Sequence, residues 1–291
     1  MAEKSISYSQ FSVYMQCPKK WEMDYVQNKR VFEQSIHTIF GTAMHETLQN
    51  YLSVMYNQSV KEADEISLPS YLQDRMVHLY REASAQLGHF STQKELHEFC
   101  LDGVQILKYF IKKRLIHFPA KSHELLGIET ELDVPLVRNI KFRGFIDVVL
   151  KDHRTGKIHI IDFKTSTRGW TQGNKSDKVK TSQLILYKEF YAKQFGVDPE
   201  MIEVEYIILR RKINENAEFV AKRIQTFSPA SGKPSRNKVA NLLSEFIQTG
   251  FTEEGEYNTT SSYPAISSSN CKYCKYGKEG SCPVADRLKR D

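Results

Sequence analysis

The chain has 291 residues, of which 40% are hydrophobic and 26% charged, and its formal net charge is +6. This composition is typical of an ordinary globular protein, and no apolar run approaches the roughly 20 residues that span a bilayer. No secretory signal opens the sequence, so we expect a cytoplasmic protein. The modest positive excess permits a polyanionic partner without requiring one.

The first third of the chain is predicted to be largely helical. Residues 7–10 fit a capping box that opens a short helix, and Pro18 breaks that helix just after Cys17. A polar connection is expected over 58–69. Apolar residues at helical spacing predict three longer helices, over 40–57, 70–86 and 93–117.

Alternation with period two follows the helices. It predicts an antiparallel meander of three strands, over 126–137, 140–151 and 157–164. The later elements expected are a helix over 181–195, strands over 202–210 and 217–227, and a helix over 236–249. We therefore predict an α/β fold with a mixed central sheet flanked by helices. We expect a single domain over 1–291, with a mostly helical part over 1–120, an α/β core over 121–250 and a cysteine-rich tail over 251–291.

Two apolar segments in the middle of the chain carry acidic residues. Gly144 to Asp147 lies in the first, Asp162-Phe163-Lys164 closes the second, and a turn-rich segment over 151–156 joins them. If the segments pair as a hairpin, Asp147 and Asp162 lie at adjacent strand ends, and Asp162 and Lys164 share a face. Two carboxylates and an ammonium suit a hard divalent cation and an activated water. The hairpin therefore predicts metal-dependent phosphodiester hydrolysis.

An acid and a lysine two residues apart on a strand can also be a solvated ion pair, worth roughly 0–1 kcal/mol. In this chain Asp162-Phe163-Lys164 is the only Asp/Glu-x-Lys triplet. It ends an apolar run in which an uncompensated charge would be costly to bury. The triplet alone leaves both interpretations open.

Three further polar residues stand near these segments in the predicted fold. His45 follows Met44 on the 40–57 helix, where it is either an edge-of-core histidine or a metal ligand through its neutral imidazole. Gln183 and Tyr187 are four residues apart and share a helix face. They are either packing residues or groups that orient a phosphate or the side chain of Lys164.

Four of the five cysteines form a pattern. Cys271, Cys274 and Cys282 are grouped in the tail, and Cys17 precedes a proline as Cys282 does. Cys100 lies on a helical apolar stripe and is expected to be a small buried hydrophobe. Disulfides are not expected in a cytosolic protein. Four thiolates suit either a tetrahedral zinc ion or a [4Fe–4S] cluster, which would join the two ends of the chain.

Taken in chain order, these motifs resemble those of the PD-(D/E)XK nuclease superfamily. The closest resemblance is to its RecB-like branch with a four-cysteine iron–sulfur cluster, found in AddB-type nuclease domains and CRISPR-associated adaptation exonucleases. Ile146 stands where the superfamily name has proline. The matching segments are 7–11 through Cys17 and Tyr25, 41–45 (GxxxH), 144–147 (GxxD), 162–164 (DxK), 183–187 (QxxxY) and the terminal cysteines.

The resemblance implies a restriction-endonuclease-like sheet and a hydrolytic site that uses Mg²⁺ or Mn²⁺. Lys164 would orient and help to deprotonate the attacking water, and Gln183 and Tyr187 would support Lys164 and the DNA backbone. The implied metal ligands are His45, Asp147, Asp162 and the backbone carbonyl of Phe163. Cys17, Cys271, Cys274 and Cys282 would hold a structural [4Fe–4S] cluster, with zinc as the alternative because the spacing from Cys274 to Cys282 is wide.

The expected activity is that of a deoxyribonuclease, an exonuclease of single strands or DNA ends in recombination, repair or DNA processing. A helicase or recombination protein is the expected partner. No GxxxxGK[ST] loop is present, so no intrinsic ATPase is expected. The alternative is a non-catalytic nucleic-acid-binding subunit with the same fold, although Asp147, Asp162 and Lys164 are all retained.

Overall fold

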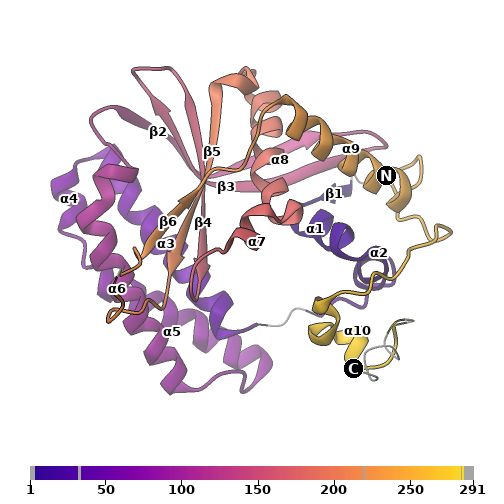
Figure 1. The fold of residues 1–291 in the computed structure, drawn as a ribbon, viewed down its shortest axis with the longest axis horizontal. Coiled ribbons are helices and arrows are strands. Elements are labelled where there is room, and N and C mark those ends of the chain that lie inside the picture. The colour runs from indigo at the N-terminus through magenta and orange to yellow at the C-terminus, as the bar shows by residue number, and fades with distance from the viewer. Residues whose placement is uncertain (1–3, 32–33, 219, 283, 285–291) are drawn as a thin grey trace.

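The computed structural model describes residues 4–31, 34–218, 220–282 and 284. Its centre is a six-stranded mixed sheet with helices on both faces, as predicted (Figure 1). The strands are β1 (Lys4–Ile6), β2 (His123–Pro135), β3 (Ile140–Asp152), β4 (Ile158–Ser166), β5 (Ile202–Arg210) and β6 (Ile224–Phe227). The antiparallel meander of β2, β3 and β4 is confirmed, and β5 then joins β4 in parallel.

The helices agree with the sequence patterns to within a few residues. The longer ones are α1 (Tyr8–Gln16), α3 (Ile36–Asn57), α5 (Leu68–Leu87), α6 (Gln93–His117), α8 (Lys178–Phe195) and α9 (Lys233–Gly250). The short ones are α2 (Pro18–Trp21), α4 (Val60–Asp64), α7 (Gln172–Ser176) and α10 (Lys275–Lys278), with a π-helical turn over Glu22–Val26 and 3-10 turns over Pro199–Met201 and Ser269–Tyr273.

Several short elements differ from the predictions. β1, α4, α7 and α10 were missed because three to five residues are too few to show a period. The predicted strand over 217–227 is confirmed only from Ile224, and the described residues 217–218 and 220–223 are not strand. A turn closes just before them, from Asn214 to Ala217, and the side chain of Asn214 accepts the N–H of Asn216 at 3.1 Å. The predicted capping box at Ser7 is half formed. Ser7 accepts the N–H of Gln10, but the Gln10 side chain donates to Tyr257 instead.

The edges of β3 explain where the sheet opens. β2 follows one edge of β3 almost throughout, whereas β1 and β4 share the other edge. Ile6 of β1 is paired with Phe142, and Ile161 of β4 is paired with Val148. Between these two pairings β4 leaves β3 and continues along β5. We call this opening the sheet fork. On this edge of β3, the backbone around Asp147 is paired with no other strand among the described residues.

Two hydrophobic cores cover the two faces of the sheet. One is built with α1, α8 and α9, and the other with α3, α5 and α6 (Figure 1). The alternation along β3 shifts at Asp147, because Ile146 packs in the first core and Val148 in the second. The facing residue of β2, Glu129, has φ +49°. The strand pair is thus irregular at the sheet fork.

The C-terminal segment that carries α10 lies beside α2 of the N-terminal segment (Figure 1). Trp21 is fully buried among aromatic rings, including those of Phe251 and Tyr263. Gly250 fits beside it, since a β-carbon there would come within 2.9 Å of the indole. Further along, the hydroxyl of Tyr276 donates to Asp24 at 2.7 Å. The tail is therefore attached to the N-terminal segment through protein contacts.

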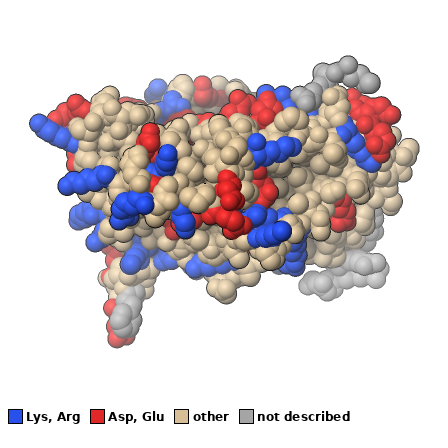
Figure 2. Space-filling model, turned by 90° about the horizontal axis from the view of Figure 1, so that it is seen from above, with Lys and Arg blue, Asp and Glu red and all other residues tan. Residues whose placement is uncertain are grey.

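Basic and acidic side chains are interspersed over the face seen in Figure 2 rather than gathered into one field. Among the described residues, none of the helices has the length and apolar character needed to cross a membrane.

Candidate active site

Asp147 and Asp162 stand on the two arms of the sheet fork. The last pair joining β3 to β4 is Val148 with Ile161, so each aspartate is the first residue beyond the pairing. The Asp147 side chain accepts the backbone N–H of Phe163 at 2.7 Å, which replaces the ladder hydrogen bond that the diverging strands no longer make. This bond fixes Asp147 against β4. The sequence prediction that the two acids lie on adjacent strands is confirmed.

Asp162 is a buried carboxylate with an incomplete set of partners. It is 2% exposed, and its Oδ2 atom accepts no hydrogen bond. The Lys164 ammonium lies 2.8 Å from that oxygen and forms an ion pair with it. Burial raises the pKa of Asp162 from 3.8 to about 6; the charge of Lys164 opposes this shift, and that of Asp147 reinforces it.

His45 reaches the two acids from α3. Its Nδ1 atom lies 3.4 Å from Oδ2 of Asp147, and its ring packs edge-on against Phe163 at 5.8 Å between centroids. Burial lowers the pKa of His45, but the neighbouring Asp147 carboxylate outweighs it, so the net shift is upward. The residue is both a histidine at the edge of the core and a member of the site.

Gln183 and Tyr187 enter the site together from α8, which begins where Asp177 caps the N–H of Val179. Gln183 donates its amide N–H to the Tyr187 hydroxyl at 3.2 Å. Burial, followed by the charge of Asp162, raises the pKa of Tyr187, so its hydroxyl keeps the proton. Gly144 leaves room for the tyrosine, because a β-carbon there would lie 3.1 Å from the ring.

A single cavity of about 530 Å³ joins these groups. Its lining includes six residues that the sequence predicted: His45, Asp147, Asp162, Lys164, Gln183 and Tyr187. The lining also includes residues 5–10, of which 7–10 were predicted as the capping box of a helix. Because β1 pairs with β3 on the same edge as β4, this segment forms a wall of the cavity. A three-residue parallel strand leaves no sequence signal that could have indicated this.

Three other lining residues were missed. Arg143 and Phe145 alternate outward along β3, and Phe145 is 48% exposed. The strand period could have predicted that Phe145 is exposed. Ile146 faces the core, so its neighbour Phe145 points to the other side. Tyr257 enters from the C-terminal segment. The Arg143 guanidinium lies 3.2 Å from Glu131, so that its charge is shared.

The groups at the sheet fork fit a divalent metal ion in their chemistry. Two carboxylates and an imidazole line one cavity, and the Oδ2 atom of the buried Asp162 is already held 2.8 Å from a cationic group, the Lys164 ammonium. The ligand atoms are not gathered as tightly as around a bound ion. Within the described ranges, the one set of three His, Cys, Asp or Glu ligand atoms that all lie within 4.8 Å is elsewhere, at His123, Asp152 and His159.

The four patterned cysteines line a second cavity, of about 300 Å³, between the N-terminal segment and the tail. They are Cys17, Cys271, Cys274 and Cys282, and all carry free thiols. In the part of the chain that the structure describes, no three of their sulfurs lie within 4.8 Å of one another. A single zinc ion with bonds of about 2.3 Å would hold them ~3.8 Å apart. Cys100 is half-buried against the core on α6.

Comparison with known proteins agrees with this geometry. A search of curated proteins found no match. A family model of the PD-(D/E)XK nuclease superfamily matches residues 5–282, from β1 through Cys282. That span contains the sheet fork, both aspartates, Lys164 and His45. The match covers nearly the whole chain, and the chain belongs to the PD-(D/E)XK nuclease superfamily, whose members are nuclease-type phosphodiesterases.

Proposed function

We propose that the chain is a Mg²⁺- or Mn²⁺-dependent deoxyribonuclease, an exonuclease that acts on single strands or DNA ends in recombination, repair or DNA processing. The observation that carries this proposal is Asp162. It is a buried carboxylate whose Oδ2 atom pairs with the Lys164 ammonium at 2.8 Å, it lies on the β4 arm of the sheet fork with Asp147 on the β3 arm, and it shares one cavity with both residues.

His45, Asp147, Asp162 and the backbone carbonyl of Phe163 would hold the metal ion. Phe163 qualifies because its N–H points to Asp147, and the N–H and C=O of one strand residue point to the same side. Its carbonyl therefore faces the gap left by the diverging strands. When bound, the ion neutralises phosphate charge and lowers the pKa of a bound water.

Lys164 acts on the water and on the phosphate. It shares a strand face with Asp162, and its side chain is 32% exposed, so the ammonium reaches into the cavity. There it donates hydrogen bonds that orient the attacking water and help its deprotonation. The same positive charge stabilises the negative charge that accumulates on the phosphate oxygens in the transition state.

Tyr187 and Gln183 form a positioning pair for the DNA backbone. Because the Tyr187 hydroxyl accepts its hydrogen bond from Gln183, its own proton is left to donate into the cavity. A phosphate oxygen of the substrate is the natural acceptor. Removal of either residue is expected to weaken substrate positioning more than metal binding.

The walls of the cavity favour a single strand or an end. Residues 5–10 line one side of the cavity, next to the sheet fork. Tyr8, Phe145 and Tyr257 supply aromatic faces on which unpaired bases can stack, worth about 1–3 kcal/mol per base. Arg143 adds a cation at the mouth.

We further propose that Cys17, Cys271, Cys274 and Cys282 hold a structural [4Fe–4S] cluster. All four cysteines line one cavity of about 300 Å³, which supports a shared group bound by their thiolates. The backbone N–H of Ser268 already lies 3.4 Å from the Cys271 sulfur, a contact of the kind that stabilises cluster thiolates. Iron and sulfide analysis of anaerobically purified protein tests this assignment, and a colourless, zinc-loaded protein would refute it.

The nuclease assignment is tested with anaerobically purified protein and DNA labelled at either end. Linear single strands, blunt duplexes and circular single strands are each incubated with Mg²⁺, Mn²⁺ or a chelator. We expect metal-dependent loss of linear substrates and survival of circles. Lys164→Met should lower the rate by about 10²–10³-fold, whereas Lys151→Met, on the same hairpin but outside the cavity, should not. Protein that binds DNA without cleaving it in any metal would refute the proposal.

A further inference from the structure

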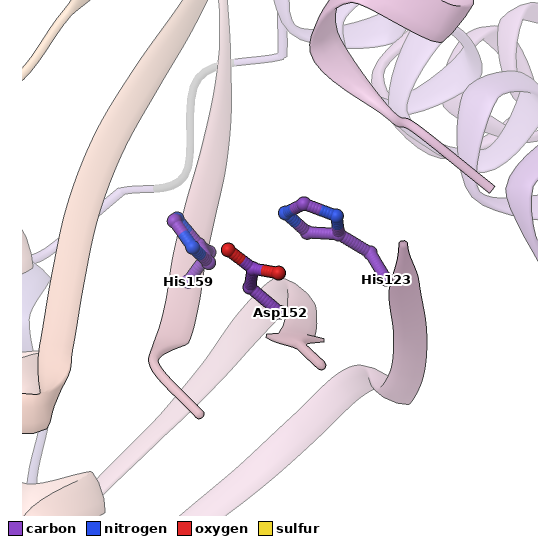
Figure 3. A group of neighbouring side chains, drawn as sticks. All are labelled: His123, Asp152 and His159. Carbon is purple, nitrogen blue, oxygen red and sulfur yellow. The ribbon is translucent and has the colours of Figure 1, made fainter. Parts of the chain in front are cut away.

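His123, Asp152 and His159 stand close together at the opposite end of the hairpin from the sheet fork. Each offers a ligand atom, and these atoms all lie within 4.8 Å of one another. Figure 3 shows the Asp152 carboxylate between the two imidazole rings. We propose that these three side chains form a second metal site, for a borderline divalent transition metal ion such as Zn²⁺. We call this group the His–Asp–His cluster.

The cluster is separate from the candidate active site. Asp152 lies five residues beyond Asp147 on β3, or about 16 Å along an extended strand. His123 is the register partner of Asp152, and His159 is the partner of Leu150, so one ligand comes from each of β2, β3 and β4. None of the three lines the cavity at the sheet fork.

Capping of the β3–β4 turn accounts for part of this arrangement but not all of it. Asp152 accepts the N–H of Arg154 at 2.9 Å and the hydroxyl of Thr155 at 3.0 Å, which satisfies the needs of a turn. The guanidinium of Arg154 also donates to this carboxylate, at 3.5 Å, and since a carboxylate has about four acceptor positions, one stays open. Turn capping does not explain why two imidazoles flank the same carboxylate.

The outer contacts of both histidines leave the opposite ring nitrogen for a metal. Nδ1 of His123 lies 3.0 Å from the hydroxyl of Ser122, and Nδ1 of His159 lies 3.6 Å from a carboxylate oxygen of Glu203. Metal-bound histidines typically use one nitrogen for the ion and donate the other to such a group.

The ligand types select the metal. Two imidazoles and one carboxylate suit borderline ions such as Zn²⁺ or Co²⁺, whereas oxygen-rich sites suit Mg²⁺. Three protein ligands leave a position for water. Because each ligand belongs to a different strand, a bound ion would fasten three strand ends and hold the register of the hairpin that carries both aspartates. A bound ion would thus raise the stability of the folded protein.

The test uses protein stripped of metal with a chelator and then titrated with Co²⁺ under anaerobic conditions. Visible ligand-field bands report binding, and sulfur-to-cobalt charge transfer in the near ultraviolet identifies ions bound by the cysteines. Wild type should bind one Co²⁺ more than His159→Gln, without a change in the charge-transfer band. His153→Gln, in the exposed turn beside the cluster, is the matched control and should bind as wild type does. Glu203→Gln should weaken this binding about 10–100-fold.

Thermal unfolding with and without Zn²⁺ provides the second readout. Zn²⁺ should raise the melting temperature of wild type and of His153→Gln more than that of His159→Gln or His123→Gln. Equal melting temperatures in chelator establish that the variants fold. The proposal is overturned if His159→Gln binds as much Co²⁺ as wild type, or if all bound Co²⁺ shows thiolate charge transfer.

Discussion

Replacing Asp162 with asparagine should stabilise the metal-free protein while it abolishes cleavage. The substitution keeps the shape of the side chain and removes a negative charge that is 2% exposed and poorly hydrogen-bonded. Burial raises the pKa of Asp162 to about 6 in the folded protein, whereas the same carboxyl has a pKa of 3.8 when it is exposed to solvent in the unfolded chain. Burying the ionised form therefore costs stability wherever the folded group must lose its proton.

The magnitude follows from that shift. A difference of about 2 pH units corresponds to about 3 kcal/mol, and this already includes the ion pair with Lys164. The folded-state pKa is raised, so the penalty is complete above pH 6, about half as large near pH 5, and absent well below pH 4. Asp162→Asn should thus unfold at a higher urea concentration than wild type at pH 8. The difference between the two midpoints should become smaller toward pH 5.

The assay is equilibrium urea unfolding in chelator from pH 5 to 8, with wild type and Asp162→Asn side by side. In thermal unfolding at pH 8, the melting temperature of Asp162→Asn should exceed that of wild type by about 5 °C. Asp152→Asn is the matched control, because its carboxyl has a pKa lowered to about 2, chiefly by the N–H of Arg154. That variant should be destabilised, most of all at high pH. An Asp162→Asn protein that is less stable than wild type at pH 8 would refute the reasoning.

Three further substitutions test the packing around the site. Gly144→Ala places a methyl group 3.1 Å from the Tyr187 ring, so we expect about tenfold slower cleavage with a stability loss of ~1–2 kcal/mol; unchanged kcat/KM would contradict this. Tyr276→Phe removes the donor to the buried carboxylate of Asp24, at a cost of about 1–3 kcal/mol, and limited proteolysis should then release the tail sooner than in wild type. Trp21→Ala should cost about 3–5 kcal/mol in urea unfolding, and a smaller loss would show that the aromatic cluster is not a main link between the chain ends.

The parts of the fold that repeat over many residues were predictable from the sequence. The helix over 93–117 was predicted with the bounds of α6, and the hairpin of β3 and β4 followed from apolar alternation around a turn. Asp162 and Lys164 share a face because the strand period fixes it. Long periodic segments carry redundant information, so a single exception does not obscure them.

The cavity itself was less predictable because it depends on contacts between distant segments. β1 is three residues long, yet its pairing with β3 brings Tyr8 and Gln10 into the wall of the active-site cavity. The divergence of β4 from β3, which opens the sheet fork, appears only once the pairing is known. The His–Asp–His cluster was missed for the same reason, since its residues are scattered over three strands.

The account's central claim is that the carboxylates of the sheet fork carry out metal-dependent phosphodiester hydrolysis. Single-turnover cleavage of end-labelled single-stranded DNA by wild type and Asp162→Asn, each with Mn²⁺, tests it most directly. We expect wild type to cleave only when metal is present, and Asp162→Asn to be folded, more stable without metal and inactive. Cleavage at wild-type rate by a folded Asp162→Asn protein would contradict the claim.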